Sequence, residues 1–442
     1  MVGSTLQAEE VLSNGGLVRT IGRWSLAALM VNTMIGGSIF GLPSLLAARL
    51  GSYSPAAYLI GAAGIGVVAA CLAEVASQFR EAGGPYLYAR VAFGQFAAIQ
   101  IGWLTWLTRT AAAAAVTNLF ITYLSEFVPQ VSIPAVRAAT MIMLIGFLAA
   151  VNYRGVRGGN WLSNFFTVTK LGVILFFALG GLTALLLHPG IRVNPSPFSP
   201  TRADWVEAIL LMIYAYGGFE AAFFAAEEAK DPRRDGPIAL CIAIGTATLL
   251  YIAVQYVVMH ILPDAASSTR TAVDTAQRFL GPAWVSVVTL GILVSMYGYL
   301  SANMLHTPRL TFAMGQRGDF PSFFGAIHPR FRTPHLSIVI FAGLVMLFSI
   351  GADFRWNAIL GAVSRLFIYG CVALALPALR KKQPNADAFR LPGGMIFTVL
   401  ALLFTGILVT QMHFREIVVV GITMLLALLT WIWARRRRRL AC

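Results

Sequence analysis

Two glycine pairs interrupt hydrophobic segments of the chain. Gly36 and Gly37 lie in the first segment, and Gly217 and Gly218 lie in the second. Glycine inside a helix costs roughly 1 kcal/mol relative to alanine, and an unwound helix exposes backbone groups that need partners. A helix that begins after a break presents free N–H groups that suit a carboxylate, whereas a helix that ends at a break presents carbonyls that suit an ammonium. The two breaks together predict a receptor for a zwitterion such as an α-amino acid.

The predicted binding site lies where the two interrupted segments meet. Its expected partners for a zwitterion are backbone groups: the amides of Gly37, Ser38 and Ile39 and the carbonyls of Tyr214, Ala215 and Gly217. Tyr214 is large enough to act as a gate, although a core aromatic residue would look the same. Close helix packing through small residues is likewise the alternative explanation for each glycine pair. The predicted substrate-binding residues are Thr33, Met34, Gly36, Gly37, Ser38, Ile39, Tyr214, Ala215, Gly217, Gly218, Glu220, Arg109, Tyr297 and Ser301.

Four charged residues fall within apolar segments of the chain, one of them in an interrupted segment. A charge in a membrane span costs at least roughly 2.5–3.5 kcal/mol and indicates function by default. Glu220 follows the second break, where it could accept a basic side chain, act as a proton site, or pair with a buried arginine such as Arg109. Lys170 and Arg365 lie inside two other segments. Glu220 and Lys170 are the predicted sites of ion or proton coupling.

Two polar residues in the segment 281–308 share a helix face. Tyr297 and Ser301 are spaced i,i+4, which places them on the same side of a helix, and Asn303 lies nearby. We expect one of these faces to close the site opposite the second break.

The composition predicts an all-α polytopic membrane protein. Of the 442 residues, 58% are hydrophobic and 12% are charged, whereas soluble domains carry about 25% charged residues. The mean hydropathy is +0.74. Twelve apolar segments are long enough to cross a membrane: 23–48, 54–78, 95–127, 133–152, 161–187, 205–229, 237–262, 281–308, 335–351, 356–378, 394–411 and 416–434. No cleaved signal peptide is expected, because no short apolar core followed by a small-residue cleavage site occurs near the start of the sequence.

The distribution of basic residues predicts the orientation in the membrane. An even number of spans places both termini on one side, and 22 of the 33 Lys and Arg residues fall on that side, against eight in the opposite loops. Since cytoplasmic loops are enriched in Lys and Arg, we expect a cell-membrane protein with a cytosolic tail at 1–22 and a basic cytosolic tail at 435–442. The net charge of +15 then reflects contact with anionic lipid rather than nucleic acid.

The sequence contains no motif typical of an enzyme or a metal site. The six histidines form no catalytic or metal-ligand spacing, and the four cysteines form no CxxC pair. We therefore expect no enzyme activity, no metal and no cofactor. A channel would require a filter repeated by symmetry, and a receptor would require a soluble output domain.

Four stretches of the chain resemble the amino acid–polyamine–organocation (APC) transporter superfamily. They are Gly36-Gly37-Ser38-Ile39-Phe40-x-x-Pro43; Glu81-Ala82-Gly83-Gly84-Pro85-Tyr86-x-Tyr88 with Phe93-Gly94 and Gly102-Trp103; Gly218-Phe219-Glu220 with Glu227-Glu228-x-Lys230-Asp231-Pro232-x-Arg234; and Arg309 with Gly318-x-Phe320-Pro321 and His328-Pro329-x-Phe331-x-Thr333-Pro334. The family usually reads Gly-Ser-Gly at the first break. Gly37 here replaces that serine, so the backbone donors remain and one hydroxyl is lost.

The resemblance implies a LeuT-type fold with two inverted five-helix repeats. These would be residues 23–187 and 205–378, with the first and sixth spans discontinuous and two extra helices within 394–434. It also implies a secondary transporter that moves an amino acid by alternating access, independently of sodium, with proton coupling or exchange. A lysine at position 170 resembles the family's substitute for a bound sodium ion, bridging spans one and eight; a permanently charged strut is the alternative. A polyamine or other organic amine is the alternative substrate, and a monomer or weak homo-oligomer in the lipid bilayer is expected.

Overall fold

A computed structural model describes residues 22–79, 83–155, 160–193, 198–220, 232–384 and 388–441, without the side chains of 160–164, 232–233 and 437–441. These residues form α-helices and short 3-10 turns, and no strand occurs among them. The predicted tail before Gly22, the second part of the predicted sixth span, and the Glu81-Ala82 and Glu227–Asp231 motif residues lie outside the described residues.

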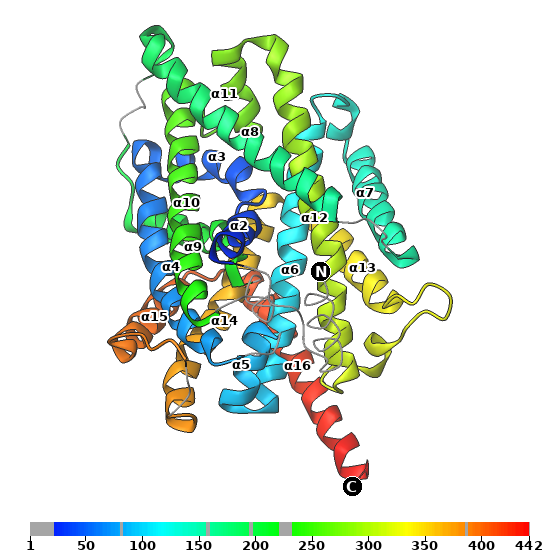
Figure 1. The fold of residues 1–442 in the computed structure, drawn as a ribbon. Helices are drawn as coiled ribbons and strands as arrows, with labels where there is room; N and C mark the ends of the chain where they lie inside the picture. Colours follow the sequence, from blue (N-terminus) through cyan, green and yellow to red (C-terminus); the bar gives the residue numbers. More distant parts are fainter. Residues whose placement is uncertain are drawn as a thin grey trace, which may run out of the picture.

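The helices follow the apolar segments of the sequence. They are α2 (Arg23–Met34), α3 (Ser38–Leu50), α4 (Ser54–Ser77), α5 (Gly84–Phe93), α6 (Gln95–Leu124), α7 (Pro134–Arg154), α8 (Asn160–Leu187), α9 (Arg202–Ala215), α10 (Pro232–Ile261), α11 (Thr271–Leu280), α12 (Val285–Gln316), α13 (His335–Gly351), α14 (Phe354–Lys382), α15 (Gly394–Val409) and α16 (Phe414–Ala441). The turns are η1 (Gly51–Tyr53), η2 (Pro129–Ser132), η3 (Pro189–Ile191), η5 (Pro282–Trp284) and η6 (Ser322–Gly325). Figure 1 shows these helices side by side in one bundle.

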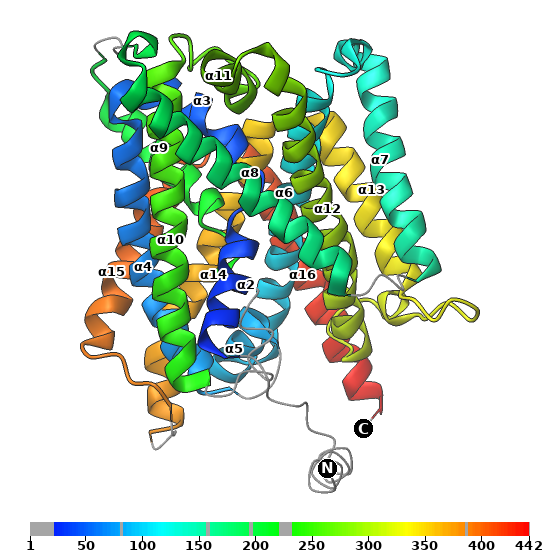
Figure 2. The ribbon, with the colours of Figure 1, turned by 45° about the horizontal axis from the view of Figure 1, so that its top comes forward.

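Length and composition support a multi-pass membrane protein. Within the described parts of the chain, seven helical segments are long and apolar enough to cross a membrane, and α13 and α15 are shorter apolar helices. The predicted all-helical, membrane-embedded class is therefore confirmed. The described start of α2 and the end of α16 lie at the same end of the bundle, at the bottom of Figure 2.

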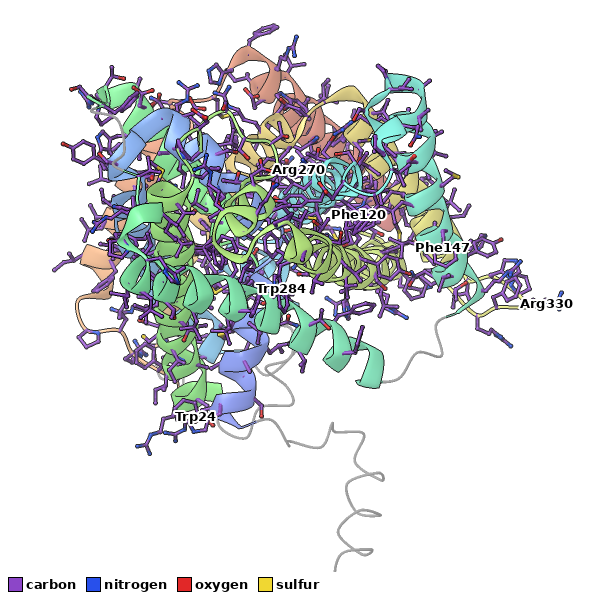
Figure 3. All side chains as sticks on the ribbon, turned by 90° about the horizontal axis from the view of Figure 1, so that it is seen from above. Trp24, Phe120, Phe147, Arg270, Trp284 and Arg330 are labelled. Carbon is purple, nitrogen blue, oxygen red and sulfur yellow. The ribbon has the colours of Figure 1, made fainter. Side chains whose placement is uncertain are left out.

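The outer surface of the bundle is apolar. Phe147 on α7 is 58% exposed, and Trp284 before α12 is 44% exposed; Phe147 lies at the edge of the bundle in the view from above (Figure 3). Soluble proteins rarely expose a large contiguous apolar surface. Large exposed side chains of this kind on several helices are what a surface in contact with lipid tails requires.

The centre of the bundle is formed by α6 and α14. The alanines 111–115 of α6 are all buried, and Gly361 of α14 lies against Ala111 and the backbone of Thr108. Small residues let two helix backbones approach closely where a hydrophobic driving force between helices is weak. Helix α9 packs against α14 of this pair, and Val116 of α6 lies next to Gly37 at the first break.

The first predicted break is present. Helix α2 ends at Met34 and α3 begins at Ser38, so Ile35, Gly36 and Gly37 stand between two helices. At the second break α9 ends at Ala215, and a turn follows. Gly218 has φ of +120°, a conformation that favours glycine. The continuation of this segment beyond Glu220 lies outside the described residues.

The two interrupted segments are antiparallel. Arg49 at the end of α3 pairs with Asp204 at the start of α9, with 3.3 Å between Nη1 and Oδ1. At the other end of both helices, the first residue of α3, Ser38, and the last of α9, Ala215, share the hydroxyl of Tyr251 as a hydrogen-bond partner. The start of α3 therefore meets the end of α9, as the sequence predicts (Figure 2).

A buried ion pair ties α4 to α14 away from the breaks. Arg380 binds both carboxylate oxygens of Glu74 at 2.7 Å, and the amide of Leu391 donates to the same carboxylate at 2.8 Å. The Glu74 side chain is fully buried. Glu74 thus has a structural role at this end of the bundle.

Replacing Glu74 with alanine should lower the free energy of unfolding by about 1–3 kcal/mol, because it removes a fully buried carboxylate and leaves Arg380 and the amide of Leu391 without their hydrogen-bond partner. Thermal unfolding of the purified protein in detergent measures the loss. Arg270→Ala is the control: in its pairs with Glu126 and Asp274 the carboxylates are exposed by a quarter or more, whereas Glu74 is fully buried, so it should cost about 1 kcal/mol or less. Equal effects of both changes would contradict the assignment.

Candidate functional site

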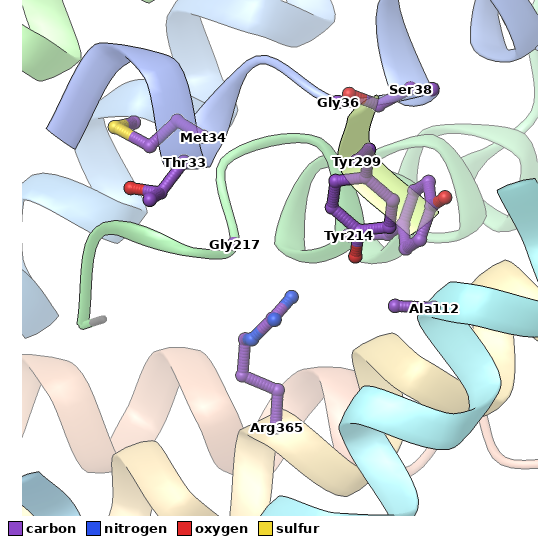
Figure 4. A pocket seen from close by; sticks show the side chains of 10 residues that line it. Thr33, Met34, Gly36, Ser38, Ala112, Tyr214, Gly217, Tyr299 and Arg365 are labelled. Atoms are coloured by element: carbon purple, nitrogen blue, oxygen red, sulfur yellow. The ribbon is translucent and has the colours of Figure 1, made fainter. Parts of the chain in front are cut away.

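A cavity lies where α3 begins and α9 ends. Its volume is about 20 Å³, which is room for about one water molecule. The lining residues come from five segments and are Thr33, Met34, Gly36, Gly37, Ser38, Ala112, Tyr214, Gly217, Tyr299 and Arg365. Figure 4 shows the side chains of Tyr214, Tyr299 and Arg365 around the cavity between the two breaks. Seven of the fourteen predicted binding residues line it, and Ala112, Tyr299 and Arg365 are additional.

The start of α3 provides unpaired hydrogen-bond donors. The amides of Phe40 and Gly41 both donate to the carbonyl of Gly37, at 3.2 and 3.1 Å. The amides of Ser38 and Ile39 have no acceptor among the described residues, as expected for the first positions of a helix. The positive end of a helix with free N–H groups is suited to bind an anion.

The end of α2 is held by Lys170 of α8. Its ammonium donates to the carbonyl of Asn32 at 2.7 Å and to that of Ile35 at 2.9 Å. These carbonyls lose their partners because the helix stops, and Lys170 is only 6% exposed. The structure thus places Lys170 at the first break, and its described hydrogen bonds reach α2 and the break but not α12.

Tyr251 of α10 joins both breaks, although its sequence context gives no signal for this role. Its hydroxyl lies 2.8 Å from the carbonyl of Ala215, 3.2 Å from that of Met34, and 3.1 Å from the hydroxyl of Ser38. A hydroxyl carries one proton and can accept others, so Tyr251 donates to one carbonyl at a time while accepting from Ser38. It is a positioning residue for the two helix ends.

A side chain at either glycine of the second break would collide with a neighbouring residue, and the neighbour differs between the two positions. A Cβ atom on Gly218 would lie 2.3 Å from the carbonyl oxygen of Thr33, so α2 and the second break are in backbone contact. A Cβ atom on Gly217 would lie 1.6 Å from Nη1 of Arg365. The guanidinium therefore occupies the space that the missing side chain leaves.

Glu220 pairs with a buried arginine, but the partner is Arg365 rather than Arg109. Nε of Arg365 lies 3.1 Å from Oε1 of Glu220, and Nη1 donates to the carbonyl of Ile213 at 3.2 Å. The other carboxylate oxygen of Glu220 accepts from the amide of Gly218 at 2.9 Å. The backbone carbonyl of Arg109 lies 3.4 Å from Asn303 of α12.

The face of α12 that meets the cavity carries Tyr299 instead of Tyr297 and Ser301. The ring of Tyr297 packs against Phe166 of α8, at 5.7 Å between centroids. Tyr299 lies two positions away, which is about 200° around a helix, and it points into the cavity (Figure 4). Its hydroxyl accepts a long hydrogen bond of 3.5 Å from Asn303.

Ion pairs fix the ends of α3 and α9 that lie away from the cavity. Arg49 also binds Glu207 of α9 at 3.0 Å, and Arg355 at the start of α14 pairs with the same carboxylate. Asp204 forms a capping box with Thr201 at the start of α9. Hydrogen bonds from Thr201, and to a lesser extent the charge of Arg49, lower the pKa of Asp204. The two helices that form the cavity are therefore joined at both ends.

Comparison with known proteins identifies relatives over nearly the whole chain. The family described as Amino acid permease matches residues 21–433. The methylthioribose transporter of Bacillus subtilis (strain 168) is 28% identical over 416 residues, which cover 88% of this chain and 87% of that protein. The branched-chain amino acid permease BcaP of the same strain is 25% identical over 448 residues, covering 96% and 95%. An uncharacterized transporter of Mycobacterium tuberculosis (strain ATCC 25618 / H37Rv) is 28% identical and covers 77% and 75%.

Tyr251→Phe should reduce uptake through the protein by roughly tenfold, because a lost hydrogen bond worth about 1.4 kcal/mol at the two breaks corresponds to that factor. Uptake into proteoliposomes at equal protein content measures the effect. Tyr86→Phe is the matched control: it removes the hydrogen bonds of another buried tyrosine hydroxyl, those with Asp319 and Arg90, and it lies on α5, which is not a broken helix. If both variants lost uptake to the same extent, Tyr251 would have no special role.

Proposed function

The chain belongs to the amino acid permease family, and we propose that it carries an amino acid across the cell membrane as a secondary transporter. The observation that carries the proposal is the cavity between the unpaired amides at the start of α3 and the carbonyls at the end of α9. The carboxylate of the substrate binds the amides of Gly37, Ser38 and Ile39. Its ammonium binds next to the carbonyls of the second break, where an oxygen that already accepts one hydrogen bond retains a second lone pair.

The proposed architecture has twelve spans, with the LeuT-type repeats at 23–187 and 205–378, two further helices within 394–434, and both termini cytosolic. The first break and its antiparallel partner support this arrangement. Discontinuous helices whose ends meet near the midplane are the usual substrate site of inverted-repeat transporters. The protein acts as a monomer or weak homo-oligomer in the bilayer.

The small volume of the cavity supports alternating access. A space of about 20 Å³ is too small for an amino acid, so substrate enters a conformation in which the walls have moved apart. Tyr214, whose ring packs edge-on against Phe354 at 5.9 Å, is the proposed gate over the site. Movement of α9 relative to α14 would separate these two rings and enlarge the cavity.

Lys170 is the proposed coupling residue. A buried ammonium that binds two carbonyls at the end of α2 occupies the position that a sodium ion would need, so transport is independent of sodium. Its protonation, or that of Glu220, couples transport to protons; otherwise the protein exchanges one substrate for another. Either route acts on α2 through the two hydrogen bonds of Lys170.

A neutral, hydroxyl-rich molecule is the second candidate substrate. The methylthioribose transporter is more similar in sequence than the branched-chain permease, at 28% against 25% identity. The cavity also contains hydroxyls and a guanidinium that would bind such a molecule. The polyamine alternative is less favoured, because Arg365 already stands at the end of α9.

Uptake by proteoliposomes that contain the purified protein tests the proposed function. Radiolabelled amino acids, methylthioribose and putrescine are compared, each with and without sodium, a pH gradient or the same compound inside. We expect uptake of at least one amino acid without sodium. Uptake of methylthioribose alone would support the second candidate, and uptake of none of these compounds would contradict both.

Lys170→Ala should abolish uptake while the protein still reaches the membrane, because the carbonyls of Asn32 and Ile35 lose their partner in the mutant. Lys382→Ala is the matched control. That lysine, the last residue of α14, also donates to two carbonyls at a helix end, those of Val91 and Ala92 at 3.0 Å, but these carbonyls lie at the end of α5, which is not a broken helix. Sodium-independent uptake by Lys170→Ala at the rate of the control would refute the coupling role.

A further inference from the structure

Arg365 presents unused hydrogen-bond donors to the cavity. A guanidinium has five N–H donors. The structure uses Nε for Glu220 and one donor of Nη1 for the carbonyl of Ile213. Arg365 lines the cavity while being only 4% exposed. The remaining N–H donors of Arg365 are therefore shielded from solvent, and a substrate in the cavity could accept hydrogen bonds from them.

Glu220 is not available to a cationic substrate. One of its carboxylate oxygens binds Arg365 and the other accepts from the amide of Gly218. Near the breaks, the described charged groups are the cations Lys170 and Arg365, the cation Arg109, which acts on Glu220 and Tyr299 electrostatically, and this one engaged carboxylate. A positively charged side chain entering the cavity would be repelled by Arg365 and would have to displace one of these bonds.

Arg365 reaches the cavity from α14, beside the second break. The carboxylate end of the site is the start of α3, and the ammonium end is the second break, where the guanidinium takes the space that Gly217 leaves. In Figure 4 the guanidinium points toward Gly217, whereas Tyr299 of α12 lies beside Tyr214 on the side of Gly36. A substrate whose α-carboxylate binds the start of α3 would therefore extend its other polar groups toward Arg365.

We propose that Arg365 determines specificity by binding an acceptor oxygen on the variable end of the substrate, which favours carboxylate, amide or hydroxyl side chains and disfavours basic ones. This inference rests on the proposed function, because it takes the backbone sites at the two breaks to hold the α-carboxylate and α-ammonium. A bidentate guanidinium prefers planar acceptors such as carboxylates and amides. Arg365 is in this view a binding residue as well as the partner of Glu220.

A binding panel on the wild-type protein is the first test. Thermal stabilisation of the purified full chain, titrated with four amino acids of similar length, gives relative affinities for glutamate, glutamine, norleucine and lysine. We expect glutamate or glutamine to bind at least about tenfold more tightly than norleucine, and lysine to bind more weakly than norleucine, because a charge-assisted hydrogen bond contributes about this much. Equal binding of lysine and norleucine would overturn the inference.

The paired variant Arg365→Met/Glu220→Gln is the second test. It removes both charges together and so avoids an unpaired buried carboxylate. We expect the preference for glutamine over norleucine to fall to about twofold or less, as the charge-assisted bond is absent. Arg380→Met/Glu74→Gln is the matched control, since it removes an equivalent buried ion pair on the same helix, away from the cavity; it should keep the wild-type preference.

The outcomes separate this inference from the proposed function. Preference that survives in the Arg365/Glu220 variant would make Arg365 a structural residue only and overturn the inference. Wild-type protein that binds norleucine and lysine alike contradicts the inference alone. Wild-type protein that binds none of the four amino acids contradicts the proposed function, and the inference falls with it.

Discussion

The carbonyl groups at two buried helix ends are the constraint on which the rest of the structure depends. A helix that stops inside a membrane leaves backbone oxygens without partners, and each such group costs several kcal/mol in contact with lipid. Here three side chains provide those partners: Lys170 for α2, Arg365 for α9, and Tyr251 for both. They come from α8, α14 and α10, so the packing of these helices is what makes the breaks stable.

The backbone groups at the two breaks differ in how many of them have hydrogen-bond partners, and this difference determines which chemical groups the site can bind. At the end of α9 the carbonyls of Ile213, Tyr214 and Ala215 all have protein partners. At the start of α3 the amides of Ser38 and Ile39 have none among the described residues. An anionic group therefore gains hydrogen bonds on entering the cavity, whereas a cationic group must share oxygens that are already bound. The cavity favours acceptors over donors.

Sequence alone predicted the breaks, their antiparallel placement and the burial of Lys170, because each leaves a local signal: paired glycines or a charge in an apolar segment. It did not predict Tyr251 or Tyr299, because a tyrosine in an apolar helix is an ordinary core residue. Tyr297 and Tyr299 each have a polar residue four positions on, so spacing could not decide which face turns inward; packing against Phe166 of α8 decides it. Arg365 was visible as a mid-span charge, but its position over Gly217 depends on tertiary structure.

Helices α2 and α3 are held by different side chains, so a substitution at one of these side chains affects one helix more than the other. α2 is bound to Lys170, and at its other end Arg23 pairs with Asp235 of α10 at 3.2 Å. α3 is bound instead to α9 through Arg49, and to Tyr251 at its first residue. Because Gly36 and Gly37 interrupt the helix, α2 and α3 can move independently of each other. Loss of the charge on Lys170 would therefore weaken the hydrogen bonds that hold the end of α2 and leave those of α3 and α9 as they are. Tyr251 would remain, among the described residues, a hydroxyl that both breaks share.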